Sequence, residues 1–222
     1  MEKLTADQSA FVYFKAIVFN LIAQLFMGII IACLSDLGEW KPTLQLAFMA
    51  VLQLAFFMAV RSSVVLCGRV TGYGIAPVKW WVIALALVCA PACVLAFVFP
   101  ANMFQVLLEN LGYASQTSID LSNNINICLA TFVTVILAPV CEEYVFRGAL
   151  LGGLVKRRGV IVSCLMSAAA FALMHMNPEQ TVYQFCLGFV AAYLTVCSRS
   201  ILPSIVLHGG NNLIAILLQV FR

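Results

Sequence analysis

Long uninterrupted runs of apolar residues are the feature that most constrains how this chain can fold. A helix that crosses the hydrocarbon core of a bilayer needs about 20 mostly apolar residues. Seven runs approach or exceed that length: 11–34, 44–66, 80–99, 125–155, 160–175, 181–196 and 201–221. A lipid-embedded backbone must satisfy its own hydrogen bonds, and these runs are too long for barrel strands. They are therefore predicted to be helices.

The composition agrees with a membrane location. Of the 222 residues, 64% are hydrophobic and 9% are charged, and the net charge is only +3. Soluble domains carry roughly 25% charged residues, so this chain has too little charge to cover a water-exposed surface. An ordinary cytosolic enzyme, a disordered chain and a nucleic-acid-binding protein are thereby excluded. The sequence predicts an all-α integral membrane protein, a single transmembrane domain over residues 1–222, built as a bundle of seven to eight transmembrane helices.

The segments between and within the runs refine this prediction. Run 11–34 is about twice as long as the apolar core of a signal peptide, so we expect it to be a retained first span. Pro100 is expected to end the third helix, and residues 103–111 to form a short interfacial helix before a polar loop. Run 125–155 contains Pro139 and is either one long, kinked helix or two elements, which decides between seven and eight spans. The distribution of Lys and Arg indicates a cytoplasmic N-terminus.

The cysteines do not indicate a metal ribbon, a redox motif or a disulfide framework. There are nine of them, all in or next to apolar runs, and none forms a C-x-x-C pair. Such a scattered, odd-numbered set is unlike the paired spacing of disulfide and zinc sites. We interpret the cysteines as small, polarizable packing residues.

Ionisable side chains inside the apolar runs are the strongest functional signal, because a charge within a bilayer is costly and usually marks function. The first group, Glu142, Glu143 and Arg147, lies in the fourth run. Glu143 and Arg147 are four residues apart and share a helix face, whereas adjacent residues point in different directions. We expect these two to form an ion pair that leaves Glu142 turned toward a cavity as a general base. The alternative is an ion-pair network that only holds the helix in register.

The chain has two histidines, and both lie in apolar segments after Glu142. His175 ends the fifth run, four residues after Phe171. A histidine in that position is often only a helix cap or an interface residue. His208 lies in the last run, four residues before Asn212, which places both on one helix face. We expect Glu142, His175 and His208 to converge on one pocket, with Asn212 as an amide donor. Such a set can activate water, directly or through a metal, and stabilise an oxyanion.

Three motifs resemble those of the CPBP family of intramembrane proteases, which comprises CAAX prenyl proteases and bacteriocin-processing and immunity proteins. The pattern E-E-x-x-x-R falls on Glu142, Glu143 and Arg147, F-x-x-x-H on Phe171 and His175, and H-x-x-x-N on His208 and Asn212. Every residue of the three motifs is present, and they span about a third of the chain.

This resemblance implies an intramembrane endopeptidase that hydrolyses a peptide bond. The implied roles are activation of water by Glu142 and His175, binding of the tetrahedral oxyanion by His208 and Asn212, and support by Glu143, Arg147 and Phe171. Glu142, His175 and His208 could instead be ligands of a divalent metal such as zinc, and the sequence leaves both options open. In this reading residues 11–124 hold the N-terminal spans and the polar loop, and residues 125–222 the catalytic helices.

The implied partners are a peptide or membrane-proximal protein substrate and the lipid bilayer, without nucleic acid. The compact chain looks bacterial, which predicts the inner or plasma membrane of a bacterial cell and a substrate such as a peptide pheromone or a bacteriocin leader. Two other functions stay open: a catalytically silent immunity or sensor-partner protein, and a proton-coupled transporter that uses the Glu and His side chains as a relay. Transport would predict polar groups along several helices and an inverted repeat, and neither is visible in the sequence.

Overall fold

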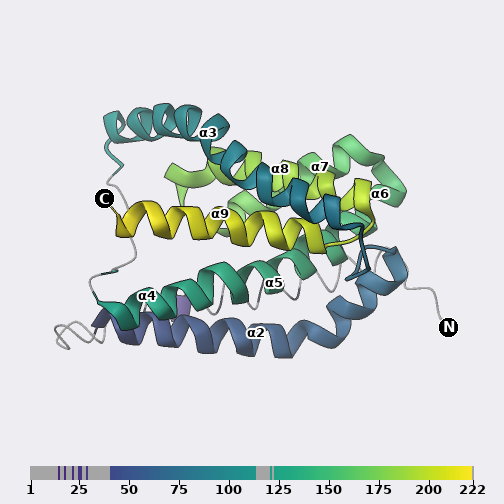
Figure 1. Cartoon of the computed structure of the whole chain (residues 1–222), viewed down its shortest axis with the longest axis horizontal. Coiled ribbons are helices and arrows are strands. Elements are labelled where there is room, and N and C mark those ends of the chain that lie inside the picture. The colour runs from purple at the N-terminus through teal and green to yellow at the C-terminus, as the bar shows by residue number, and fades with distance from the viewer. Residues whose placement is uncertain are drawn as a thin grey trace.

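A computed structural model describes residues 41–113, 121 and 123–221, with the isolated positions 15, 18, 22, 25, 26 and 29. Apart from those six positions, the predicted first span, residues 11–34, lies outside the described residues. The described part contains helices and no strand (Figure 1). Its long rods are α2 (Lys41–Thr71), α3 (Trp80–Asn110), the continuous rod α4–α6 (Asn124–Arg158), α7 (Val160–Met174), α8 (Thr181–Ser198) and α9 (Leu202–Val220).

The predicted helical class is confirmed for the described residues, whereas the predicted number of spans is not. Six helical rods are present in this part of the chain. By length and composition, four of them can cross a membrane: α3, the α4–α6 rod, α8 with the short helix before it, and α9. α7 is apolar but has only 15 residues. The prediction of seven to eight transmembrane helices rested on counting every apolar run as one full span, and α7 shows that a run can form a shorter helix.

The α4–α6 rod carries the glutamate motif and does not divide at Pro139. Its segments are α4 (Asn124–Thr131), the π-helical η2 (Phe132–Leu137), α5 (Ala138–Glu143), the π-helical η3 (Tyr144–Leu151) and α6 (Gly152–Arg158). Pro139 lies at the start of α5, directly after the wider η2 turn, where a missing backbone N–H is tolerated. π-helical turns within α-helices are frequent at functional sites, and two of them flank the glutamates here. The alternative of two separate elements is therefore excluded.

The third helix continues past the proline that was expected to end it. Both Pro91 and Pro100 lie inside α3, which runs on to Asn110 and bends along its length (Figure 1). Proline removes one backbone hydrogen bond and can kink a helix without ending it. Membrane helices tolerate this loss because neighbouring groups satisfy the freed carbonyl. The separate interfacial helix predicted over residues 103–111 is consequently wrong, since those residues belong to the last turns of α3.

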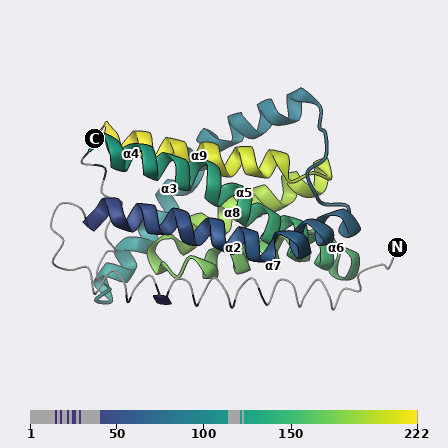
Figure 2. The same cartoon turned by 90° about the horizontal axis from the view of Figure 1, so that it is seen from below.

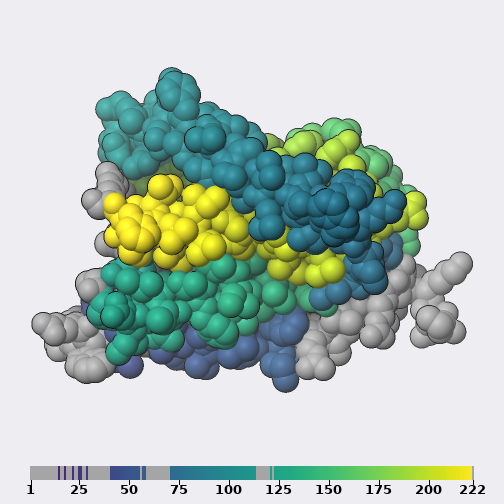
Figure 3. Space-filling view, in the orientation of Figure 1, coloured from purple at the N-terminus to yellow at the C-terminus, as the bar shows by residue number. Residues whose placement is uncertain are grey.

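α9 lies between α3 and the α4–α6 rod (Figure 1). It packs against α3, α8, η2 and α5, while α2 lies along the far side of the α4–α6 rod (Figures 1 and 2). On the face shown in Figure 3, α9 is enclosed between α3 on one side and the surface of the α4–α6 rod on the other. This position brings the last helix, which carries His208, beside the rod that carries the two glutamates.

A glycine sets the distance between α9 and the π-helical turn η2. A Cβ atom added at Gly209 would lie 2.6 Å from the carbonyl oxygen of Val135 and would have to displace backbone. At the neighbouring Gly210, an added Cβ would meet only the Cβ of Ala90, at 3.3 Å. Gly209 is therefore the position where a side chain would push the two rods apart, directly beside His208.

We expect Gly209→Ala to destabilise the protein by about 1–3 kcal/mol, the usual cost of overpacking a tight interior. The same change should impair any activity that depends on the spacing between His208 and Glu142. Gly210→Ala is the matched control, because its contact can be relieved by a small shift. The measurement is the thermal unfolding temperature of each variant in detergent. Equal stability of the two variants would contradict the tight approach of α9 to η2.

Candidate active site

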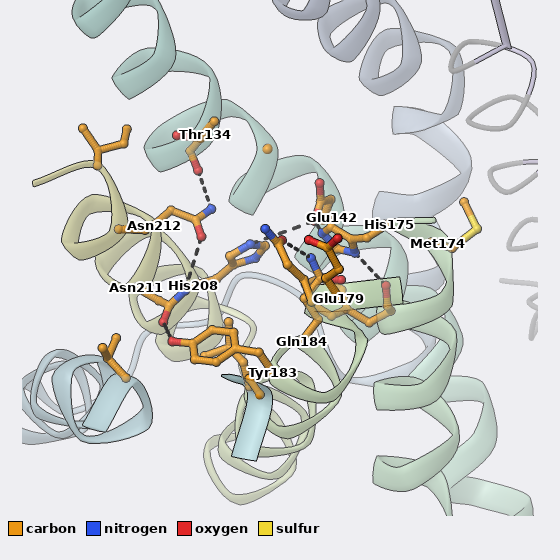
Figure 4. Close-up of a pocket in the computed structure, with 18 of the residues that line it drawn as sticks. Thr134, Glu142, Met174, His175, Glu179, Tyr183, Gln184, His208, Asn211 and Asn212 are labelled. Atoms are coloured by element: carbon orange, nitrogen blue, oxygen red, sulfur yellow. Dashed lines mark hydrogen bonds and ion pairs between the residues drawn. The ribbon is translucent and has the colours of Figure 1, made fainter. Parts of the chain in front are cut away.

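The three groups expected to meet do so in one cavity. Glu142 lies in the last turn of α5, His175 caps the C-terminus of α7, and His208 lies in the first half of α9. All three line a cavity of about 880 Å³ between the helices (Figure 4). Their convergence is a property of the fold, since residues 142, 175 and 208 come from three separate rods.

The Glu142 carboxylate lies between the two imidazoles. Its Oε2 is 3.8 Å from Nε2 of His175 and 4.0 Å from Nε2 of His208. Both separations exceed the 2.7–3.2 Å of a direct N–H···O hydrogen bond, and both leave room for a bridging water. Glu142 Oε2 is buried and finds no hydrogen-bond donor among the described residues. The Glu142 oxygen that lacks a hydrogen-bond donor is thus the one that faces both histidines.

Each histidine is oriented by a hydrogen bond at its other ring nitrogen. His175 Nδ1 lies 2.8 Å from the carbonyl oxygen of Phe171, and His208 Nδ1 lies 3.1 Å from Oε1 of Glu143. Both partners are acceptors, so Nδ1 carries the hydrogen in each ring and donates it. In a neutral imidazole this leaves the lone pair on Nε2, the atom that faces Glu142. Two lone pairs and a carboxylate oxygen therefore face a common point.

Glu143 and Arg147 form the predicted ion pair, deeper than the Glu142 carboxylate. Arg147 Nε lies 3.0 Å from Glu143 Oε2, and both side chains are fully buried. Arg147 also donates from Nη2 to the carbonyl oxygen of Gly188 in α8, at 3.0 Å. Because Glu143 also accepts from His208, the pair links the α4–α6 rod to α8 and α9. Adjacent glutamates thus have different environments: Glu142 faces the cavity and Glu143 faces the protein interior.

Phe171 forms a common wall behind these polar groups. Its buried ring makes edge-type contacts with the His175 and His208 rings, at centroid distances of 4.6 and 5.3 Å. The guanidinium carbon of Arg147 lies 4.6 Å from the centre of the same ring, a cation–π contact. One side chain therefore limits the orientation of both imidazoles. This placement accounts for an aromatic residue one helical turn before His175.

The asparagines after His208 belong to a hydrogen-bonded chain along one cavity wall (Figure 4). Asn212 Nδ2 donates to the carbonyl oxygen of Thr134 in η2 at 2.7 Å, and Asn211 Nδ2 donates to Asn212 Oδ1 at 3.4 Å. Tyr183 of α8 donates its hydroxyl hydrogen to Asn211 Oδ1. The Asn212 amide lines the cavity and is held by the backbone of the α4–α6 rod. Thr134 takes one of the two N–H donors of that amide.

Sequence reasoning missed several polar groups of the cavity. Gln53 of α2 donates from Nε2 to Glu142 Oε1 at 3.4 Å, although the N-terminal half was assigned no site residue. Tyr183 and Gln184 of α8 and Glu179 of the 3-10 turn η4 (Pro178–Gln180) also line the cavity. A lone glutamine in an apolar run, or a polar turn between two helices, carries no motif. The only sequence signal was the spacing of Gln180 and Gln184, which share a helix face.

The separations in the site are slightly longer than those between the ligands of a tetrahedral zinc ion. Zinc binds nitrogen and oxygen ligands at about 2.0–2.2 Å, which places neighbouring ligand atoms about 3.3–3.6 Å apart. The distances from Glu142 Oε2 to His175 and His208 are 3.8 and 4.0 Å. Within the ranges that the structure describes, no three His, Cys, Asp or Glu side chains have metal-ligand spacing. The three groups present one carboxylate oxygen and two imidazole nitrogens, a set that can hold a water or ligate a metal ion.

Comparisons with known proteins agree with the motif assignment. A family model described as type II CAAX prenyl endopeptidase Rce1-like matches residues 124–214, from the start of α4 into α9. The protein named "Putative membrane peptidase YdiL" of Bacillus subtilis (strain 168) is 25% identical over 92 residues. That alignment covers 41% of this chain and 38% of the relative, so it spans well under half of the relative's length. No solved structure matches the chain.

The matched segment contains all three motifs and all three groups that meet in the cavity. The family resemblance predicted from those motifs is thereby confirmed: over residues 124–214, this chain matches the Rce1-like type II CAAX prenyl endopeptidase family.

Proposed function

We propose that the chain is an intramembrane endopeptidase that hydrolyses a peptide bond with water activated by Glu142. The observation that carries this proposal is the convergence of Glu142 Oε2 with the Nε2 atoms of His175 and His208, at 3.8 and 4.0 Å. The match to a prenyl endopeptidase family supports the same chemistry. Four helices apolar and long enough to cross a membrane support a membrane-embedded site.

The first step of the proposed reaction is attack of water on the carbonyl carbon of the substrate. A water between Glu142 and His175 transfers one proton to Glu142 Oε2 as its oxygen bonds to that carbon. Water can donate only two hydrogen bonds, whereas Glu142 and the two imidazoles together present three acceptors. One further proton is therefore needed at the site, and we assign it to Nε2 of His208, whose Nδ1 donates to Glu143 Oε1 at 3.1 Å.

The second step is collapse of the tetrahedral intermediate. His208 donates from Nε2 to the oxyanion, and the second N–H of Asn212 is the other proposed donor. The proton held by Glu142 passes to the leaving amine nitrogen as the C–N bond breaks. The products are a carboxylic acid and an amine, and the site returns to its starting charge. Arg147 and Phe171 act at a distance by holding Glu143 and the imidazole rings in place.

The size and the lining of the cavity support a peptide as the proposed substrate. Its volume of about 880 Å³ is at the upper end of typical ligand pockets. Apolar side chains form most of the wall, and the polar groups include the catalytic residues and the asparagine chain. We propose a peptide or membrane-proximal segment as substrate, and the cytoplasmic membrane of a bacterial cell as the location.

The direct test is hydrolysis by the purified full chain in lipid nanodiscs. A mixture of synthetic peptides of varied sequence, prenylated and unprenylated, is incubated in H₂¹⁸O and analysed by mass spectrometry. Incorporation of ¹⁸O into a new C-terminal carboxylate is the expected result. Absence of any cleavage across the mixture would favour the catalytically silent partner, and proton flux into sealed vesicles that hold the same protein would favour the transporter.

Dependence on a divalent metal stays a prediction, and the same assay tests it. If Glu142 and the histidines activate water without a metal, cleavage survives removal of metal with a chelator. Activity that is lost on chelation and restored by added zinc would assign Glu142, His175 and His208 as ligands of that metal. The matched control is the chelator saturated with zinc, which has the same chemistry without the capacity to extract an ion.

A further inference from the structure

A second polar group lies in the same cavity, beyond the residues used in the proposed reaction. Gln180 and Glu179 lie in the turn η4, and Gln184 lies in the first turn of α8. Gln184 is only 8% exposed, and its Nε2 donates to Gln180 Oε1 at 3.1 Å. Its Oε1 is buried and accepts no hydrogen bond from the described residues. A buried amide oxygen without a donor, on a side chain that lines a cavity, is a candidate acceptor for a ligand.

The chain around Glu179 is held by a defined turn after His175. Asn177 Oδ1 accepts from the backbone N–H of Glu179 at 3.2 Å, and the Asn177 carbonyl oxygen accepts from Thr181 at 2.9 Å. Met176 takes a positive φ of 48°, which reverses the chain at the end of α7. Glu179 is thereby brought back to line the same cavity as His175, four residues after it (Figure 4).

Carboxylates outnumber cationic groups in the lining of the cavity. Among the described residues that line it there are two glutamates, Glu142 and Glu179, and no lysine or arginine. The other polar groups of the lining are His175, His208, the hydroxyls of Thr134 and Tyr183, and neutral amides such as Gln105 of α3. Apolar walls of low dielectric focus the field of such carboxylates into the cavity. A cationic group is therefore favoured there over a neutral or an anionic one.

We propose that Glu179 and Gln184 form a subsite that binds a lysine or arginine side chain of a peptide. Ammonium and guanidinium groups are donors only, and they match a carboxylate together with an amide oxygen. An apolar side chain in this place would leave Gln184 Oε1 unsatisfied, and an acidic one would meet the Glu179 charge. Resting on the proposed function, the subsite holds a basic residue of the substrate near the peptide bond that is cleaved at Glu142.

The experiment compares three synthetic peptides that differ at one position, which carries lysine, norleucine or glutamate, with that position scanned along the peptide. Binding is measured by fluorescence anisotropy on the full chain in nanodiscs of neutral lipid, in the Glu142→Gln background so that no peptide is consumed. We expect the lysine peptide to bind about tenfold or more tightly than the norleucine peptide, the usual effect of a charge-assisted hydrogen bond. Glu179→Gln should reduce that preference to less than about threefold.

Two further variants keep the result interpretable. Glu179→Asp keeps the charge and should restore most of the preference, whereas Glu109→Gln removes a charge from an exposed position of α3 and should leave the preference unchanged. Equal binding of the lysine and norleucine peptides, or a preference that persists in Glu179→Gln, would overturn the subsite. Because binding is read without turnover, a protein that prefers basic peptides yet cleaves none would refute the proposed function and leave the subsite standing.

Discussion

Replacing Glu142 with glutamine is expected to lower kcat by about 10²–10⁴-fold, the usual contribution of a positioned general base. Glutamine has nearly the same shape and can still accept a hydrogen bond, but it cannot take a proton from water. Because Glu142 faces the cavity and is not part of the buried ion pair, its charge contributes little to the packing of the rods. The rate of peptide hydrolysis should therefore fall steeply, whereas the thermal unfolding temperature should stay nearly constant.

Gln53→Leu is the matched control for this change. It removes the 3.4 Å hydrogen bond to Glu142 Oε1 and leaves the carboxylate in place. We expect a modest loss of activity, of roughly tenfold or less, because a hydrogen bond to a charged group contributes about 1.5 kcal/mol or more only when it is well formed. Hydrolysis that survives Glu142→Gln at the wild-type rate would rule out Glu142 as the base.

Replacing Arg147 with methionine is expected to destabilise the protein by about 3–5 kcal/mol, because it leaves the Glu143 carboxylate buried without its cation. Both side chains have no exposed surface, so water cannot take the place of the lost partner. The change also removes the donor to the Gly188 carbonyl and the cation beside Phe171. The measurement is the midpoint of denaturant or thermal unfolding in detergent, with the amount of folded protein recovered from membranes as a second readout.

The double variant Glu143→Gln/Arg147→Met separates charge from packing. Because it removes both charges, it should be more stable than Arg147→Met alone, even though one more native group has been lost. Its histidine geometry should still suffer, since His208 Nδ1 loses a carboxylate partner. A double variant no more stable than the single one would show that the pair stabilises the protein through packing rather than through compensation of charge.

The fold was predictable to the level of its helices, and the reasons for the errors are physical. Apolar runs longer than 18 residues located α3 and the α4–α6 rod, because hydropathy reports what lipid will accept. The predicted end of α3 was wrong, because Pro100 removes one backbone hydrogen bond but does not end the helix. The sequence could not decide between one rod through Pro139 and two separate helices, because the π-helical turns η2 and η3 have no sequence signature.

The candidate site was predictable where local spacing decides it. A separation of four residues placed Glu143 beside Arg147 and Phe171 beside His175, and both contacts are present. The contribution of α2 and of η4 could not be predicted, because Gln53 and Glu179 reach the cavity only through the packing of distant segments. The sequence also could not predict which glutamate accepts the hydrogen bond from His208 Nδ1. In the structure it is Glu143 and not Glu142.

The order of residues along the chain was sufficient to establish a lipid-embedded helical protein with a glutamate and two histidines on separate helices, because hydropathy and helical periodicity are local properties. Only the packed bundle decided which atoms of those groups face one another. Gly209 allows α9 to approach the carbonyl of Val135, and the buried Glu143–Arg147 pair ties the glutamate rod to α8. Distances of 3.8 and 4.0 Å between residues tens of positions apart depend on these contacts between helices, and no local pattern encodes them.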